Sequence, residues 1–131
     1  MDDDAPGSPD TDDPLLAIVD GANVVGSRPD GWWRDRKGAA ERLRDRLAAG
    51  GLPGRPDPVE IVLVVEGAAR GVESVPGVRV ESAPGSGDDR IVELVAGSAG
   101  RDRLVITADR ELRRRVTDLG AEVAGPRTAL A

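Results

Sequence analysis

The chain has 131 residues, 39% of them hydrophobic, and a formal net charge of −6, which is enough apolar sequence for one domain with one core. It contains no histidine, cysteine, tyrosine or phenylalanine. These absences exclude disulfides, thiolate nucleophiles, imidazole catalysis and zinc sites built from Cys or His. Catalysis would have to use carboxylates, hydroxyls, arginines and backbone groups, a set that suits a hard metal ion bound through oxygen.

The negative charge is concentrated at the N-terminus. Six of the 24 acidic residues lie within residues 1–14, so residues 15–131 carry equal numbers of acidic and basic side chains. Residues 1–14 are almost free of apolar side chains and are predicted to form a disordered acidic tail, with the folded domain over residues 15–131. No secretory signal and no apolar run long enough for a membrane span is recognisable, which predicts a cytoplasmic protein without membrane contact.

Predicted strands and helices alternate along the rest of the chain. Residues 15–19 are an unbroken apolar run, typical of a strand buried on both faces, and a loop over residues 20–30 and a helix over 33–49 follow. Further on we expect strands over 59–65, 78–81, 103–107 and 121–124, helices over 88–99 and 109–119, and one helical turn near 68–72. The connection before the strand at 78–81 is short for a parallel crossover, and the alternating pattern of that strand suits a sheet edge. This order predicts a three-layer α/β/α sandwich around a central, mostly parallel sheet of about five strands.

Carboxylates stand at all four strand-to-helix junctions, namely Asp20, Glu66, the pair Asp88 and Asp89, and Asp109. Because the carboxyl ends of parallel strands meet at one edge of the sheet, we expect these side chains at a common rim. Each of them alone also fits a helix cap or a turn. Together they would repel one another, and a bound Mg²⁺ or Mn²⁺ would relieve that repulsion, orient a water and stabilise charge on a phosphate.

Two neutral polar side chains belong to the same predicted rim. Asn23 could hold a metal-bound water or a phosphate, or it could close an Asx turn. Thr107 could present its hydroxyl to a substrate, or it could simply favour the strand.

Three motifs, at residues 18–25 (IVDGANVV), 87–93 (GDDRIVE) and 105–109 (VITAD), resemble those of the NYN domains of the PIN-like nuclease superfamily, in particular the bacterial single-domain NYN ribonucleases. They occur in the family's order and roughly at its spacing, and the resemblance covers about residues 15–126. It implies a metal-dependent endoribonuclease with an acidic active site. By this resemblance, the catalytic positions are Asp20, Asn23, Asp89 and Asp109, Asp88 could replace or assist Asp89, and Glu66 is a less secure metal ligand.

Binding of RNA requires contacts to phosphates and bases. Trp32 and Trp33 are the only aromatic residues, and we expect one to be buried and one, taken as Trp33, to stack on an unpaired base. The predicted phosphate contacts are Arg28, Arg34 and Arg110. Spacings of three and four also place Arg110, Arg113 and Arg114 on one helix face, which could guide RNA or could be solvated and paired with acids.

The sequence thus predicts a Mg²⁺- or Mn²⁺-dependent endoribonuclease that hydrolyses single-stranded RNA. The alternative is a PIN-like RNA- or protein-binding module without catalysis. Convergence of Asp20, Asp89 and Asp109 would favour the enzyme, and an outward-facing Asp89 would favour the module. Contact with a ribosome or with a second copy of the chain is left open by the sequence.

Overall fold

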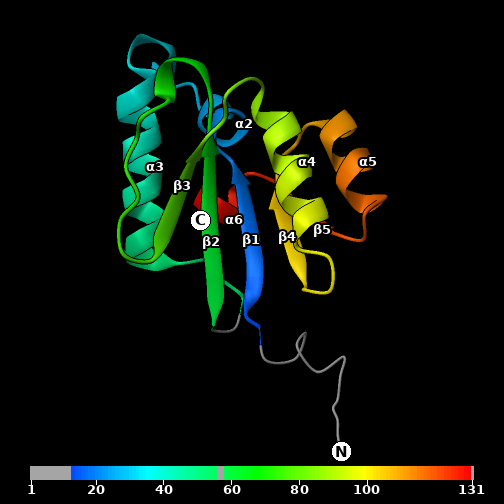
Figure 1. Cartoon of the computed structure of the whole chain (residues 1–131). Coiled ribbons are helices and arrows are strands. Elements are labelled where there is room, and N and C mark those ends of the chain that lie inside the picture. The colour runs from blue at the N-terminus through cyan, green and yellow to red at the C-terminus, as the bar shows by residue number, and fades with distance from the viewer. Residues whose placement is uncertain (1–12, 56–57, 131) are drawn as a thin grey trace, which may run out of the picture.

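Five parallel strands form the centre of the fold, in the order β3-β2-β1-β4-β5 (Figure 1). The structure is a computed structural model and describes residues 13–55 and 58–130; residues 1–12 of the predicted acidic tail lie outside this range. The strands are β1 (Leu15–Asp20), β2 (Val59–Val65), β3 (Val78–Ser82), β4 (Arg103–Ile106) and β5 (Glu122–Ala124). The first strand therefore lies in the middle of the sheet, between β2 and β4.

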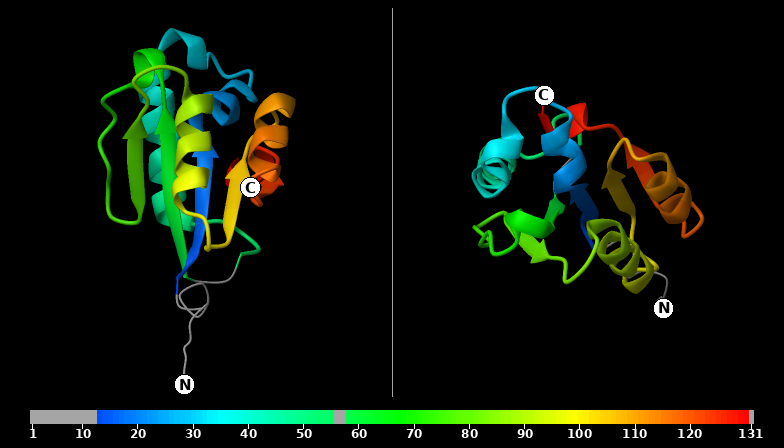
Figure 2. Two further views of the ribbon diagram at one scale, coloured as in Figure 1. Left: turned by 45° about the vertical axis from the view of Figure 1, so that its right-hand side comes forward. Right: turned by 90° about the horizontal axis from the view of Figure 1, so that it is seen from above.

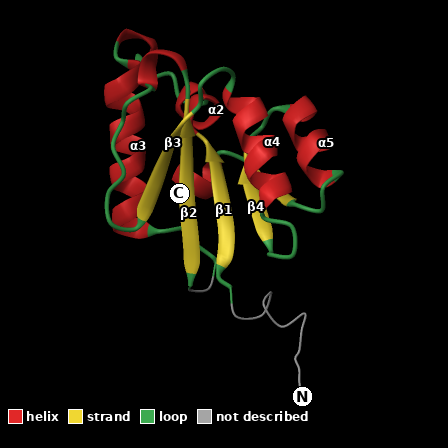
Figure 3. Ribbon diagram, in the orientation of Figure 1, coloured by secondary structure: helices red, strands yellow, loops and turns green. Residues whose placement is uncertain are grey.

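Helices cover both faces of the sheet. They are α2 (Gly21–Gly26), α3 (Arg36–Gly50), α4 (Gly87–Gly97), α5 (Arg110–Thr117) and α6 (Arg127–Leu130), with short 3₁₀ turns η1 (Trp32–Arg34) and η2 (Gly67–Ala69). Figures 2 and 3 show α3 and α6 on one face and α4 and α5 on the other, with α2 at the carboxyl ends of the strands. The predicted three-layer α/β/α sandwich is confirmed. In the described part of the chain, no helix has the length and apolar character needed to cross a membrane.

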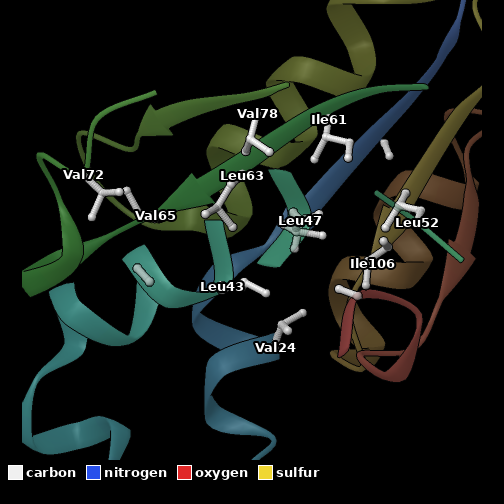
Figure 4. Close-up of a cluster of buried hydrophobic side chains, with 14 of the residues drawn as sticks. Val24, Leu43, Leu47, Leu52, Ile61, Leu63, Val65, Val72, Val78 and Ile106 are labelled. Atoms are coloured by element: carbon white, nitrogen blue, oxygen red, sulfur yellow. The ribbon is translucent and has the colours of Figure 1, made fainter. Parts of the chain in front are cut away.

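Side chains of β1 alternate between two buried clusters. Ala17 and Val19 belong to the cluster on the α3 side (Figure 4), and Leu16 and Ile18 belong to the cluster under α4 and α5. The strand is buried on both faces, as its unbroken apolar run predicts. Because alternate side chains of a strand point to the same face, Asp20 lies on the same face of the sheet as Ile18, the face covered by α4 and α5.

The predicted loop over residues 20–30 is wrong in its first half, because α2 begins directly after β1. A Cβ on Gly21 would lie 2.6 Å from the carbonyl oxygen of Val64, so only glycine allows the helix to start this close to β2. The predicted helix from residue 33 is likewise divided into η1 and α3. The carboxylate of Asp35 accepts a hydrogen bond of 3.0 Å from the backbone N–H of Gly38, and this cap fixes the start of α3.

The strand β3 lies at a sheet edge, as its alternating pattern predicts. It runs parallel to β2 although the connection between them is short. The connection contains η2, turns and extended chain, and no full helix covers the sheet at this crossover. The carboxyl end of β3 therefore lies at the same edge of the sheet as those of the other four strands.

Candidate active site

Asp20 is a buried carboxylate at the end of the central strand, only 4% exposed. One of its oxygens, Oδ2, accepts a hydrogen bond of 2.9 Å from the hydroxyl of Thr107, and Oδ1 accepts a longer one, of 3.4 Å, from the backbone N–H of Asn23. The pKa of Asp20 is raised to about 6, chiefly by burial and to a smaller extent by the negative charges of Asp88 and Glu66, while the two hydrogen bonds oppose the rise. A nearby cation would favour the ionised form of Asp20 and lower this pKa.

Three further carboxylates share the region of Asp20. Glu66 follows the end of β2, and its Oε1 accepts a hydrogen bond of 2.7 Å from the backbone N–H of Gly87 at the start of α4. Asp88 is partly buried, and its pKa is raised first by burial and then by the negative charges of Asp109 and Glu66. We call Asp20, Glu66, Asp88 and Asp109 the acidic cluster.

Asp89 lies outside the acidic cluster, contrary to the predicted convergence. Its side chain is 69% exposed and forms an ion pair of 3.1 Å with Arg115 of α5. The helix cap is Ser86, whose hydroxyl accepts a hydrogen bond of 3.1 Å from the backbone N–H of Asp89, so Asp88 is not a cap either. The acid that α4 contributes to the cluster is Asp88, which the motif had marked only as a neighbour of Asp89.

Asn23 and Thr107 hold the site together rather than facing a substrate. The side-chain oxygen of Asn23 accepts a hydrogen bond of 2.8 Å from the backbone N–H of Ala108, which ties α2 to the loop after β4. Thr107 is fully buried; besides donating to Asp20, it accepts a hydrogen bond of 3.1 Å from the backbone N–H of Asp109. The predicted substrate contact of Thr107 is therefore wrong, and its hydroxyl positions two carboxylate residues instead.

Asp109 has two partners of different kinds. Its Oδ1 accepts a hydrogen bond of 2.8 Å from the backbone N–H of Leu112, so it caps α5 as the helix pattern predicts. Its negative charge also raises the pKa of Asp88, so the capping residue contributes to the acidic cluster as well.

The oxygen donors of the acidic cluster suit Mg²⁺ or Mn²⁺ in chemistry. Within residues 13–55 and 58–130, however, no three carboxylates are arranged to hold a metal ion by themselves. Magnesium commonly keeps several waters and binds through one or two carboxylates together with substrate phosphates. The cluster fits that manner of binding and does not fit an all-protein cage.

Trp33 is exposed and Trp32 is partly buried, so the expected difference between the two rings is present but neither ring is fully buried. Trp33 is 53% exposed, and the guanidinium of Arg34 lies 5.8 Å from its ring centroid. Trp32 is partly buried, and the two rings meet edge to face, with centroids 6.1 Å apart. An exposed indole beside an arginine is a suitable platform for an unpaired base.

Of the two interpretations of the basic face on the last helix, pairing with acids is met at Arg114. Arg113 turns back and donates a hydrogen bond of 2.8 Å to the carbonyl oxygen of Thr107. Arg114 pairs with Glu111 and Asp118. Arg110 alone is exposed without an ion pair among the described residues, so it remains the phosphate contact that this helix offers.

Basic side chains without a carboxylate partner gather around α2, η1, α3 and α6. In the described ranges, ion pairs hold the arginines of α4 and β3 and two on α5. By contrast, no described carboxylate pairs with the predicted contacts Arg28 and Arg34, nor with Arg36, Lys37, Arg42, Arg46 and Arg127. Arg28 and Arg46 both donate to the carbonyl oxygen of Leu130. The sequence alone does not predict which basic side chains lack a carboxylate partner, because pairing depends on which acidic side chains lie opposite them in the fold.

Comparison with known proteins supports the fold. No family model and no curated protein matches the chain. Among solved structures, it is similar to the crystal structure of Rae1 (YacP) from Bacillus subtilis, a W164L mutant, with a TM-score of 0.64 and 20% sequence identity over 88% of this chain and 71% of that chain. At this identity the likeness is one of fold, and it agrees with a PIN-like three-layer sandwich.

Proposed function

We propose that this protein is a Mg²⁺- or Mn²⁺-dependent endoribonuclease that hydrolyses phosphodiester bonds of single-stranded RNA. The observation that carries the proposal is the acidic cluster at the carboxyl end of a parallel sheet, where ligands of such folds bind. Three carboxylates from separate parts of the chain lie there with the buried Asp20. The resemblance of the three motifs to NYN domains and the PIN-like fold are in accord with it.

A bound divalent cation would supply a Lewis acid and an activated water. Asp20 and Asp88 are the residues that would hold it, since burial and the neighbouring acids raise the pKa of both carboxyls and a cation would relieve that strain. Thr107 keeps the Asp20 carboxylate oriented through its hydroxyl. Glu66 and Asp109 are anchored to the first turns of α4 and α5 and add negative charge around the site.

The substrate assignment rests on the cationic and aromatic side chains near the cluster. The exposed ring of Trp33 with Arg34 offers stacking and charge together. Arg28 and Arg110 are exposed; Arg28 lines a pocket together with Ala108, and Arg110 begins α5 just after the loop that Asn23 ties down. Positive groups of this kind bind the phosphate backbone without regard to sequence, and an aromatic ring selects unpaired bases.

Asp88 and Asp89 provide a matched test because they are adjacent residues of the same type. Asp88→Asn should lower Mn²⁺-dependent cleavage of a labelled single-stranded RNA about a hundredfold or more, because it removes a cluster carboxylate. Asp89→Asn should keep activity within about threefold, because it breaks only an exposed ion pair. Equal losses in both variants, or full cleavage by the unchanged protein in EDTA, would count against the proposal.

A module that binds RNA without cleaving it is the second candidate. It is favoured by the outward position of Asp89 and by the absence, in the described ranges, of three carboxylates arranged to hold a metal. The same RNA with the unchanged protein separates the two functions. Binding with no Mn²⁺-dependent product would establish the module, and cleavage would exclude it.

A further inference from the structure

A small, mainly apolar pocket lies at the same end of the sheet as the acidic cluster, on the side of α3. Trp32 and Arg36 form part of its wall, and the small side chains of Ala22 and Ala69 form another part. Its volume is about 120 Å³, close to the roughly 150 Å³ of an apolar protein cavity that admits benzene. The pocket can therefore receive the ring of a flat aromatic ligand.

The indole of Trp32 is held in place on several sides. The guanidinium of Arg36 lies 5.3 Å from its ring centroid, and the Trp33 ring meets it edge to face. A Cβ on Gly26 would lie only 3.5 Å from the Trp32 ring, so α2 passes directly beside it. An aromatic wall that is already fixed loses little conformational freedom when a ligand stacks on it.

The pocket and the acidic cluster lie on opposite sides of the same short stretch of backbone. Gly21 lines the pocket, and the residue before it is Asp20. Glu66 also lines the pocket, while its carboxylate bonds to Gly87 on the other side of the sheet. A nucleotide with its base in the pocket would therefore have its sugar and phosphate at the rim formed by these residues, beside the acidic cluster.

We infer that the pocket beside Trp32 binds one unstacked nucleobase of the RNA strand. The position of the attached phosphate at the acidic cluster rests on the proposed function, whereas binding of the base does not. Arg36 makes no ion pair with a described carboxylate, so its charge is available to the adjoining phosphate. Stacking on the indole face and a cation beside it are the features that bind single-stranded nucleic acid.

The scarcity of aromatic residues makes the inference directly measurable. Trp33→Phe leaves Trp32 as the only tryptophan of the chain and retains an aromatic ring beside it. In EDTA, adenosine monophosphate should quench the fluorescence of this variant saturably, with a Kd in roughly the millimolar range. Ribose 5-phosphate, which has the phosphate and lacks the base, should not.

A second pair of substitutions tests the location. In the Trp33→Phe protein, Ala22→Leu should raise the Kd about tenfold or more, because the larger side chain enters the pocket. Ala48→Leu, at an exposed position of α3 outside the pocket, should leave the Kd unchanged. Circular dichroism spectra that match the parent protein would show that both variants are folded.

The outcomes separate this inference from the proposed function. Absence of saturable quenching, equal quenching by ribose 5-phosphate, or an unchanged Kd in folded Ala22→Leu would overturn the base pocket, whether or not RNA is cleaved. Quenching of the expected kind without any Mn²⁺-dependent cleavage would keep the base pocket and refute the nuclease.

Discussion

Replacement of Asp20 by asparagine should stabilise the metal-free protein at neutral pH. Asp20 is 4% exposed, and burial raises its pKa from 3.8 to about 6. Its protonated form is thus favoured in the folded state, and folding binds a proton between about pH 4 and pH 6. The stability that this proton confers is fully present below pH 4 and is lost as the pH rises through 6.

The size of the effect follows from the shift. A change of about two pKa units corresponds to roughly 3 kcal/mol of unfolding free energy, and the side chain is sufficiently buried for most of it to be felt. Asparagine has nearly the same shape, is never charged and can still accept the hydrogen bond from Thr107. We therefore expect Asp20→Asn to be about 1–3 kcal/mol more stable at pH 8 and nearly equal to the unchanged protein at pH 4.

Urea denaturation in EDTA at several pH values between 4 and 8 measures this difference directly. Because both proteins share all other titrating groups, the difference between their curves isolates Asp20, together with its coupling to Asp88 and Glu66. A difference that does not change with pH, or an Asp20→Asn protein that is less stable at pH 8, would refute the reasoning. Added Mn²⁺ should then reduce the difference by stabilising only the protein that retains the carboxylate.

Three further substitutions test separate parts of the structure. Trp33→Ala should weaken binding of single-stranded RNA about tenfold in a fluorescence anisotropy titration while kcat stays within about threefold; unchanged affinity would remove the stacking role. Thr107→Val should lower kcat about tenfold or more with little change in KM. It should also shift the acidic limb of the pH–rate profile to higher pH, because Asp20 loses a hydrogen bond that lowers its pKa. Thr107→Ser should restore both kcat and the profile, and a loss of stability without a shifted profile would contradict the positioning role. Arg103 is buried and donates hydrogen bonds to three backbone carbonyls. Arg103→Met should therefore lower the unfolding free energy measured in urea by about 2–4 kcal/mol without changing RNA affinity. An unchanged midpoint of urea denaturation would show that these hydrogen bonds add no net stability.

Strands and the rim of the sheet could be predicted from the sequence because burial leaves a direct pattern. The unbroken apolar run at residues 15–19 and the nearly continuous run at 59–65 correspond to β1 and β2, each of which has five buried residues. The acids follow these runs, so their gathering at one edge is a consequence of parallel strand direction. Because the side chains of a strand alternate between the two faces of the sheet, Asp20, Glu66 and Thr107 are also predicted to lie on one face.

Features that depend on tertiary contacts could not be predicted in this way. The helix α2 is short and has no strong apolar period, and it forms because Asp20 caps it and Gly21 permits its close approach to β2. The burial of Thr107 and its hydrogen bond to Asp20 likewise depend on residues that are distant in sequence. The parallel direction of β3 follows from its pairing with β2, and its own residues do not specify it.

The choice between Asp88 and Asp89 was nevertheless contained in the sequence. Ser86 is followed three residues later by Asp89, a spacing typical of a helix N-terminus, and a cap at Ser86 fixes the phase of α4. From that start, Asp88 lies three and seven positions before Ile91 and Val95, the two core side chains of the helix, and so shares their inward face. Asp89 is turned about 100° away and meets Arg115 in an exposed ion pair of the kind that adds little stability. On the apolar face of the first turn of α4, the Asp88 carboxylate neither caps the helix nor occupies a fully solvated position. Asp88 is therefore the residue of the motif best placed for chemistry.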